Sequence, residues 1–197
     1  MDSADAYESH ASEFLKVRDQ SIIGTRVVEK WAGSFGDGAR VIELGCGGGY
    51  PITQVLHAAN LQLWAVDSSP TLVSRFQIRF PHIPVQCRRV QECNFFDQTY
   101  DGAIAIGLMF LLPKSCQQAL IEAVAGILNP GGRFLFSAPT ETGEWVDVNT
   151  GHLCRSLGRA VYEAYFASAN LQLANTFMDV GGNHYYELTR AAQACID

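Results

Sequence analysis

The sequence has no run of apolar residues long enough to span a bilayer, so it predicts no transmembrane helix. Its first residues are polar and acidic, without the character of a signal peptide. No two of its six cysteines have C-x-x-C spacing, which argues against the common zinc and redox motifs. We therefore expect free thiols in a reducing cytoplasm, no bound metal and no membrane partner. The cysteines are Cys46, Cys87, Cys93, Cys116, Cys154 and Cys195.

Positive charge is also scarce in this chain. It has 14 Lys and Arg against 20 Asp and Glu, for a formal net charge of −6. Nucleic-acid surfaces depend on clustered basic side chains, and the only local basic groups here are Arg88–Arg89 and Arg75–Arg79. We therefore expect no nucleic-acid partner. A length of 197 residues, 48 % of them hydrophobic and without repeats, fits one α/β domain over residues 1–197.

The apolar periodicity predicts two helices, then alternating strands and helices, then a closing pair of strands. This order indicates an α/β fold of Rossmann-like type, with a doubly wound, mostly parallel seven-stranded sheet, an antiparallel C-terminal strand and helices on both faces. Residues 139–156 have no clear period. The predicted helices include 3–16, 20–32, 114–128 and 158–169, and the predicted strands are 40–44, 61–66, 84–88, 100–106, 133–137, 171–179 and 183–189.

A glycine-rich loop follows the first predicted strand. The strand contains Glu43, and glycines follow it at positions 45, 47 and 49. Glycine lets bare backbone approach a ligand and tolerates positive φ. A dinucleotide fingerprint, G-x-G-x-x-G, needs Gly or Ala at position 50, which is Tyr50. The E-x-G-x-G-x-G spacing therefore disfavours an NAD-dependent oxidoreductase.

A carboxylate ends the second predicted strand. Asp67 lies 22 residues after Gly45 and is followed by Ser69-Pro70, a strong helix start. Ligands of open α/β sheets bind at the carboxyl ends of the strands, where one carboxylate can accept both hydroxyls of a ribose. The alternative is that Asp67 only caps the helix. The preceding glycine loop favours the ribose role.

Two further segments complete a family pattern. Tyr100-Asp101-Gly102-Ala103-Ile104 and Leu128-Asn129-Pro130-Gly131-Gly132-Arg133-Phe134-Leu135 are similar to the strand-four entry and the pre-strand-five turn of class I S-adenosylmethionine (SAM) dependent methyltransferases. With the glycine loop and Asp67, the resemblance covers residues 38–138. It implies an enzyme that uses SAM, releases S-adenosylhomocysteine (SAH), and is covered by helices of residues 1–36 and an acceptor-side loop at 139–156.

The resemblance also implies a set of residues that bind SAM. Tyr7 would close over the cofactor or only pack on the sheet, and Arg18 would reach the SAM carboxylate or be a surface residue. Arg89 stands where the family often has an acid for the adenine amine, so the backbone of Val90 and the side chain of Gln91 are candidate substitutes. The full predicted set is Glu43, Gly45, Cys46, Gly47, Gly49, Asp67, Ser68, Val90, Gln91, Gly107, Tyr7 and Arg18.

The acceptor is less visible in the sequence. Trp145 could form an apolar wall, His152 or Asp147 could accept a proton, and Tyr185 could face the cleft. Methyl transfer is an in-line displacement in which a general base is optional. The residues after strand four are not the Asp/Asn-Pro-Pro-aromatic motif of nucleic-acid amino-methylating enzymes, which favours a small-molecule acceptor. The competing hypothesis is a catalytically silent protein of methyltransferase type that binds SAM or a nucleoside.

Overall fold

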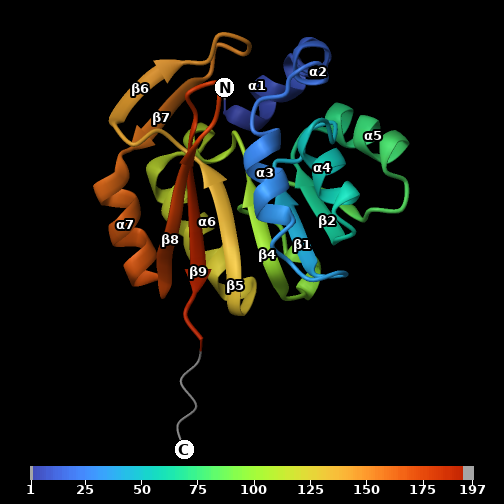
Figure 1. The fold of residues 1–197 in the computed structure, drawn as a ribbon. Coiled ribbons are helices and arrows are strands. Elements are labelled where there is room, and N and C mark those ends of the chain that lie inside the picture. Colours follow the sequence, from blue (N-terminus) through green and yellow to red (C-terminus); the bar gives the residue numbers. More distant parts are fainter. Residues whose placement is uncertain (1, 193–197) are drawn as a thin grey trace, which may run out of the picture.

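The fold is built on one seven-stranded sheet (Figure 1). The computed structural model describes residues 2–192, so Cys195 lies outside the described residues. The strands are β1 Arg40–Leu44, β2 Gln62–Asp67, β3 Val85–Cys87, β4 Tyr100–Ala105, β5 Leu128–Ser137, β8 Leu171–Met178 and β9 His184–Arg190. Their spatial order is β3-β2-β1-β4-β5-β9-β8. Strands β1 to β5 pair in parallel and β9 pairs antiparallel with β5 and β8, which confirms the predicted fold class.

Helices cover both faces of the sheet. On one face lie α3 (Thr25–Ala32), α4 (Ile52–Ala58) and α5 (Pro70–Arg79), and on the other lie α6 (Lys114–Ile127) and α7 (Arg159–Ser168). Neighbouring residues of a strand point to opposite faces, so Val41 packs with the α3–α4 side and Ile42 with the α6–α7 side. No helix within residues 2–192 has the length and apolar character needed to cross a membrane.

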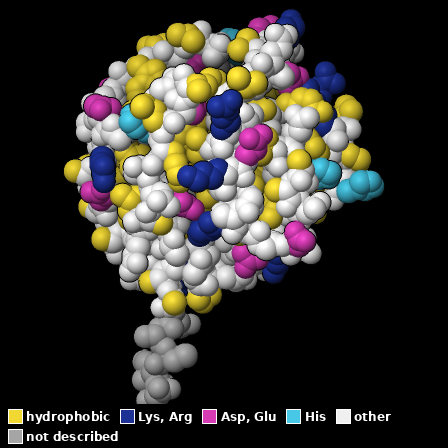
Figure 2. Space-filling view, in the orientation of Figure 1, with side chains coloured by type: hydrophobic (Ala, Val, Ile, Leu, Met, Phe, Trp, Pro, Cys, Tyr) yellow, Lys and Arg dark blue, Asp and Glu magenta, His cyan; other side chains and the backbone are white. Residues whose placement is uncertain are grey.

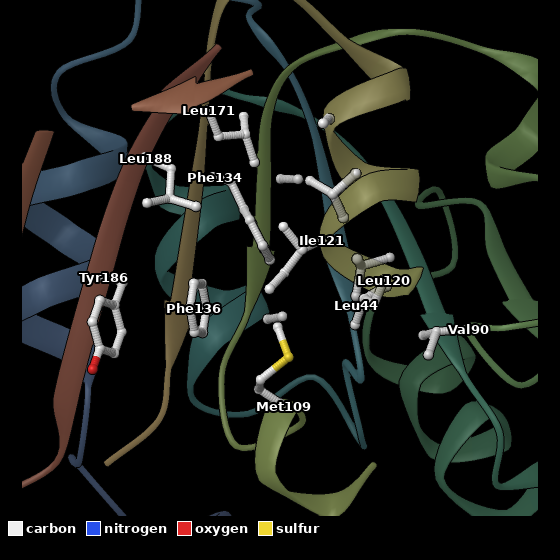
Figure 3. Close-up of a cluster of buried hydrophobic side chains, with 14 of the residues drawn as sticks. Leu44, Val90, Met109, Leu120, Ile121, Phe134, Phe136, Leu171, Tyr186 and Leu188 are labelled. Atoms are coloured by element: carbon white, nitrogen blue, oxygen red, sulfur yellow. The ribbon is translucent and has the colours of Figure 1, made fainter. Parts of the chain in front are cut away.

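The larger core cluster is rich in aromatic rings, and it fixes β5 and β9 beneath the cleft described below (Figure 3). Phe136 of β5 and Tyr186 of β9 are fully buried, and their rings stack with centroids 5.0 Å apart. Phe134, Tyr162 and Phe166 lie within 6 Å of the Phe136 ring centroid. The Tyr186 hydroxyl is buried without a hydrogen-bond partner among the described residues.

The N-terminal segment differs from its prediction. In place of one helix over 3–16 there are two, α1 (Ser3–Ser9) and α2 (Ala11–Arg18), separated at His10. The His10 ring is hydrogen-bonded to the carbonyl oxygen of Ala6 at 2.9 Å. Helix α3 begins at Thr25 and not at residue 20, because Gly24 has a φ of +86°, which a right-handed helix does not accommodate.

Residues 139–156 form a hairpin that the sequence did not reveal. Strands β6 (Thr142–Val146) and β7 (Leu153–Leu157) pair antiparallel in a separate two-stranded sheet. All five residues of β6 are exposed, so no alternation of apolar and polar residues marks the strand. The hairpin projects beyond the seven-stranded sheet on the same side as α1 (Figure 1).

Candidate functional site

A cleft of about 770 Å³ lies at the carboxyl ends of the parallel strands. This volume is within the range of roughly 300–1,000 Å³ found for small-molecule sites. The cleft is lined by residues at the strand ends, by residues of the N-terminal helices and by residues of the β6–β7 hairpin. Figure 1 shows these helices and this hairpin at the same end of the sheet. Of the predicted site residues, it brings together Tyr7, Arg18, Gly45, Gly47, Asp67, Ser68, Val90, Gln91, Gly107, Asp147, His152 and Tyr185. Four others do not line it: Glu43, Cys46, Gly49 and Trp145.

The glycine loop divides into ligand-facing and core-facing positions. Gly45 and Gly47 line the cleft with φ of +74° and +56°, values that favour glycine. Gly49 also has a positive φ, but a Cβ there would lie 2.5 Å from the ring of Phe80. Cys46 is buried in the small core cluster with Phe76. The third glycine of the motif therefore permits the close packing of an aromatic side chain, and the first two form the cleft wall.

Asp67 connects the end of β2 to this loop. Its Oδ2 accepts a hydrogen bond from the Gly47 N–H at 2.8 Å, and its Oδ1 accepts one from the Ser69 N–H at 2.9 Å. Asp67 is 9 % exposed, and burial raises the pKa of its carboxyl while the backbone hydrogen bonds oppose this. Ser69 also caps α5 through the Leu72 N–H, as predicted. Each Asp67 oxygen retains a lone pair for a ligand hydroxyl.

Glu43 is buried behind the cleft wall. Its carboxylate accepts a hydrogen bond from the Thr53 hydroxyl at 2.6 Å. Burial raises the pKa of Glu43 to about 8, although the Thr53 hydrogen bond and the charge of Arg18 oppose the shift. The contact with Thr53 joins β1 to α4, and this is the structural role that the described contacts give Glu43.

We expect Glu43→Gln to flatten the pH dependence of the unfolding free energy. The folded protein keeps the Glu43 proton up to its pKa of about 8, whereas an unfolded glutamate loses it near a pKa of ~4.3. This stabilising contribution is complete below the unfolded pKa and is lost as pH rises through the folded pKa, by at most about 1.4 kcal/mol per pH unit. Urea unfolding of both proteins from about pH 5 to about pH 8 measures it, and parallel curves would contradict the assignment.

The N-terminal helices bring a cation and a phenol to the cleft. Arg18 is half-buried, with its guanidinium 3.4 Å from the Ser21 hydroxyl and from the Ile23 carbonyl oxygen. Within residues 2–192 it makes no ion pair with a carboxylate, and burial lowers its pKa. Tyr7 lies on α1 and donates a hydrogen bond to Asp147 Oδ2 at 3.4 Å. This contact joins the helical cover to the hairpin above the cleft.

The hairpin side of the cleft holds the two predicted proton acceptors. Asp147 Oδ1 accepts the backbone N–H groups of Asn149 and Thr150 at 2.8 and 2.9 Å, and Oδ2 receives Tyr7, so both oxygens already have donors. His152 Nε2 lies 3.0 Å from the carbonyl oxygen of Leu111. Because a carbonyl can only accept, Nε2 carries the proton and Nδ1 keeps a free lone pair. His152 is therefore the stronger candidate for a base.

Trp145 lies outside the cleft, whereas Tyr185 lines it. Trp145 is 36 % exposed and packs on Phe110, with ring centroids 5.3 Å apart. Phe110, not Trp145, lines the cleft. Tyr185 is buried, reaches the cleft, and donates its hydroxyl hydrogen to Asp179 Oδ2 at 2.6 Å. Burial and this hydrogen bond raise its pKa, so Tyr185 is a neutral phenol held by Asp179.

The cleft also includes residues outside the predicted site set. Ser137 ends β5, and its hydroxyl accepts the Gly107 N–H at 2.8 Å, which holds the loop after β4 against β5. Its position at the carboxyl end of a central strand was an available signal. Asp2 and Arg89 also line the cleft, far apart in sequence. An apolar wall is formed by Ile106, Leu108, Phe110, Leu111, Leu112 and Leu153.

The cleft has the chemistry to hold a nucleoside attached to an amino acid. It offers bare backbone at Gly45 and Gly47, a buried carboxylate at Asp67 for hydroxyls, and the half-buried guanidinium of Arg18 for a carboxylate. These groups fit SAM. Within residues 2–192, no group of three His, Cys, Asp or Glu side chains is arranged to hold a metal ion.

Comparison with known proteins agrees with this geometry. Residues 41–132 match the family described as methyltransferase domain. A ubiquinone biosynthesis O-methyltransferase from Xanthomonas campestris pv. campestris (strain B100) is 32 % identical over 108 residues, which cover 53 % of this chain and 45 % of the relative. The chain thus spans about half the length of the curated relatives it matches.

Solved structures share the whole fold. The magnesium protoporphyrin IX methyltransferase of Synechocystis PCC 6803 with bound SAH has a TM-score of 0.76 at 15 % identity, over 95 % of this chain and 97 % of that one. The 1,6-didemethyltoxoflavin-N1-methyltransferase of Burkholderia thailandensis, with bound 1,6-didemethyltoxoflavin and SAH, has a TM-score of 0.71 at 16 % identity, over 98 % and 92 %. At these identities the similarity establishes the fold.

Proposed function

We propose that this protein, whose residues 41–132 belong to the methyltransferase domain family, transfers a methyl group from SAM to a small-molecule acceptor. The class I methyltransferase fold of the chain supports this proposal. The observation that carries the proposal is that one cleft combines the Gly45–Gly47 backbone and Asp67 with an apolar wall and with His152, whose Nε2 is bonded to the Leu111 carbonyl oxygen. A site that only stored a nucleoside would not need the apolar wall or a side chain that can accept a proton.

SAM supplies a methyl group that its sulfonium already activates. The chain then has to bind, orient and shield the reactants. Asp67 would accept the ribose hydroxyls, Arg18 would pair with the carboxylate, and the Gly45 and Gly47 backbone would follow the ligand closely. The apolar wall around Leu108 would exclude water from the transfer path.

Asp67→Ala should weaken SAM binding by roughly 1.5–3 kcal/mol, the cost of losing a hydrogen bond to a charged group. This corresponds to an increase in Kd of about 10-fold to 150-fold. Asp67→Asn keeps the side-chain size and one acceptor oxygen, so its affinity for SAM should fall less than that of Asp67→Ala. Calorimetry with SAM and SAH measures both, and thermal unfolding without ligand controls for the lost contact with Gly47. Unchanged affinity in Asp67→Ala would refute the ribose role.

We propose that the acceptor atom is an oxygen on a compound with an apolar body. The relatives named as O-methyltransferases support the oxygen, and so does His152, because a hydroxyl must lose its proton during transfer. Exposed apolar side chains on the hairpin support the apolar body: Val146 is 59 % exposed, Val148 95 % and Leu153 46 %. Hydrophobic side chains gather along this upper edge in Figure 2.

Charge and thiols support the remaining parts of the proposal. The net charge of −6 disfavours a nucleic-acid acceptor. The five cysteines within residues 2–192 are free thiols, in keeping with a reducing compartment such as the cytoplasm.

The test combines binding with turnover. Calorimetry should show binding of SAM and SAH but not of NAD. A screen of phenols, alcohols and amines with matched apolar bodies should then yield SAH with the hydroxyl compounds. Turnover on amines alone would refute the oxygen acceptor. Binding without turnover on any acceptor would favour a silent SAM-binding protein, and tight NAD binding without SAM binding would overturn the proposal.

A further inference from the structure

The end of the cleft beside β3 is bounded by two distant parts of the chain. Strand β3 pairs with β2 so that Cys87 lies opposite Asp67, and the Arg88 N–H donates to the Asp67 carbonyl oxygen at 2.9 Å. The wall beyond Asp67 is therefore made by residues 88–91 and, from above, by residues 2–4. Suppose that Asp67 binds the ribose of SAM and that the methionine part, which carries the sulfur, lies along the glycine loop. The adenine at the other end of the ribose then faces this wall.

Arg89 by itself could not accept a hydrogen bond from the amino group of adenine. A guanidinium carries only hydrogen-bond donors, and the exocyclic amino group of adenine is also a donor. In the structure, however, Arg89 forms an ion pair with Asp2 and a second one with Asp5 at 3.6 Å. The carboxylates of Asp2 and Asp5 accept the N–H groups of Arg89, and their oxygens supply hydrogen-bond acceptors at this wall.

Two sets of hydrogen bonds fix the position of Asp2: its own cap of α1, and the contacts of Glu8, at the other end of α1, with helix α5. Asp2 caps α1, with Oδ1 accepting the Asp5 N–H at 3.1 Å, while Oδ2 receives Arg89. At the other end of α1, Glu8 accepts hydrogen bonds from the hydroxyls of Ser69 and Thr71 at the start of α5. Partial burial is the largest single influence and raises the pKa of Asp2. The hydrogen bond and charge of Arg89, together with backbone hydrogen bonds from Asp5 and Ala4, outweigh it, so the pKa of Asp2 is lowered overall and the carboxylate stays ionised.

We propose that Asp2, positioned by Arg89, is the acceptor for the exocyclic amino group of adenine and sets the preference of the cleft for an adenosyl cofactor. This inference rests on the proposed function, since it requires SAM in the cleft. Asp2 lines the cleft, whereas Asp5 does not and is 63 % exposed at its side chain, so Asp5 serves to hold Arg89. The carboxylate thus comes from the N-terminal helix and not from the residue that follows β3.

The test compares SAH with S-inosylhomocysteine, in which an oxygen replaces the amino group of the base. An ionised Asp2 accepts from the amino group and repels the oxygen, so the wild-type protein should bind SAH at least about tenfold more tightly. An asparagine can accept from one base or donate to the other, so Asp2→Asn should abolish most of this preference. Arg89→Ala should reduce it, because Asp2 loses its partner. Calorimetry on proteins tagged only at the C-terminus gives the affinity of each of the three proteins for both ligands directly.

Two matched variants serve as controls. Gln91→Ala removes the side chain that the sequence offered as a substitute acceptor on this wall, and Asp5→Asn removes the outer ion pair. Both variants should keep the wild-type preference for SAH. An unchanged preference in Asp2→Asn, or a loss in Gln91→Ala alone, overturns the inference while leaving SAM binding intact. If the wild-type protein binds neither ligand, the proposed function fails and this inference fails with it. Circular dichroism verifies the fold of each variant.

Discussion

Replacing His152 with alanine is expected to slow methyl transfer to a hydroxyl acceptor by about 100-fold to 10,000-fold, the usual contribution of a general base. The reason is the fixed tautomer: Nε2 donates to the Leu111 carbonyl oxygen at 3.0 Å, which leaves Nδ1 to take the proton from the acceptor. Affinity for SAH should not change, because His152 belongs to the hairpin side of the cleft. Single-turnover rates and calorimetry on the same preparations measure the two effects separately.

Two controls distinguish a catalytic role of His152 from a purely structural one. His152→Gln keeps a side-chain N–H that can bond to Leu111 but has no basic atom, so it should be as slow as the alanine variant. The deficit of both variants should shrink with acceptors whose hydroxyl is more acidic, since these need less help in losing the proton. Full activity in His152→Gln, or a deficit independent of acceptor acidity, would show that His152 only supports the hairpin.

Phe136→Ala is expected to lower the unfolding free energy by about 3–5 kcal/mol, as for other large-to-small changes of buried aromatic residues. Phe136 has no exposed surface and contacts four aromatic rings from β5, α7 and β9, so no single neighbour can fill the space. For a chain of this size the melting temperature should fall by roughly 6–20 °C. Urea and thermal unfolding followed by circular dichroism measure the change.

Tyr186→Phe is the matched control for this experiment. Tyr186 stacks on Phe136 at 5.0 Å, and its hydroxyl is buried without a partner among the described residues. Burial raises the pKa of Tyr186 to about 12, so the group lost is a neutral hydroxyl. Removing it keeps the stacked ring and should be neutral or stabilising by up to about 1 kcal/mol. A loss of less than about 1 kcal/mol in Phe136→Ala would contradict the assignment of this cluster as the main support of β5.

The glycine loop illustrates how far the sequence analysis extends. The strand, the loop and Asp67 were predicted because their signals are local: an apolar run, glycines at fixed offsets and a helix cap. The same pattern did not separate the glycines that face the cleft from Gly49, whose neighbour is Phe80. Phe80 follows another helix, and no spacing within the loop encodes its approach.

The hairpin and the N-terminal cover show where local signals end. Strand β6 buries no face, so it has no period to detect. Tyr7 meets Asp147 across 140 positions, and Asp2 meets Arg89 across 87, so neither contact follows from the residues around it. His152 was one of two candidate bases in the sequence. The contacts that distinguish it from Asp147, with the Leu111 carbonyl oxygen for His152 and with the Tyr7 hydroxyl for Asp147, come from distant parts of the chain.

The sequence predicted the fold class, and it placed Gly45, Gly47 and Asp67 at the ends of two neighbouring strands, because the signals for these strands and their loops are local. The wall formed by Asp2 and Arg89, the tautomer of His152 and the apolar wall of the cleft were decided by the tertiary structure. Each of these depends on elements distant in the chain that pack together, and their geometry arises only when the sheet has assembled.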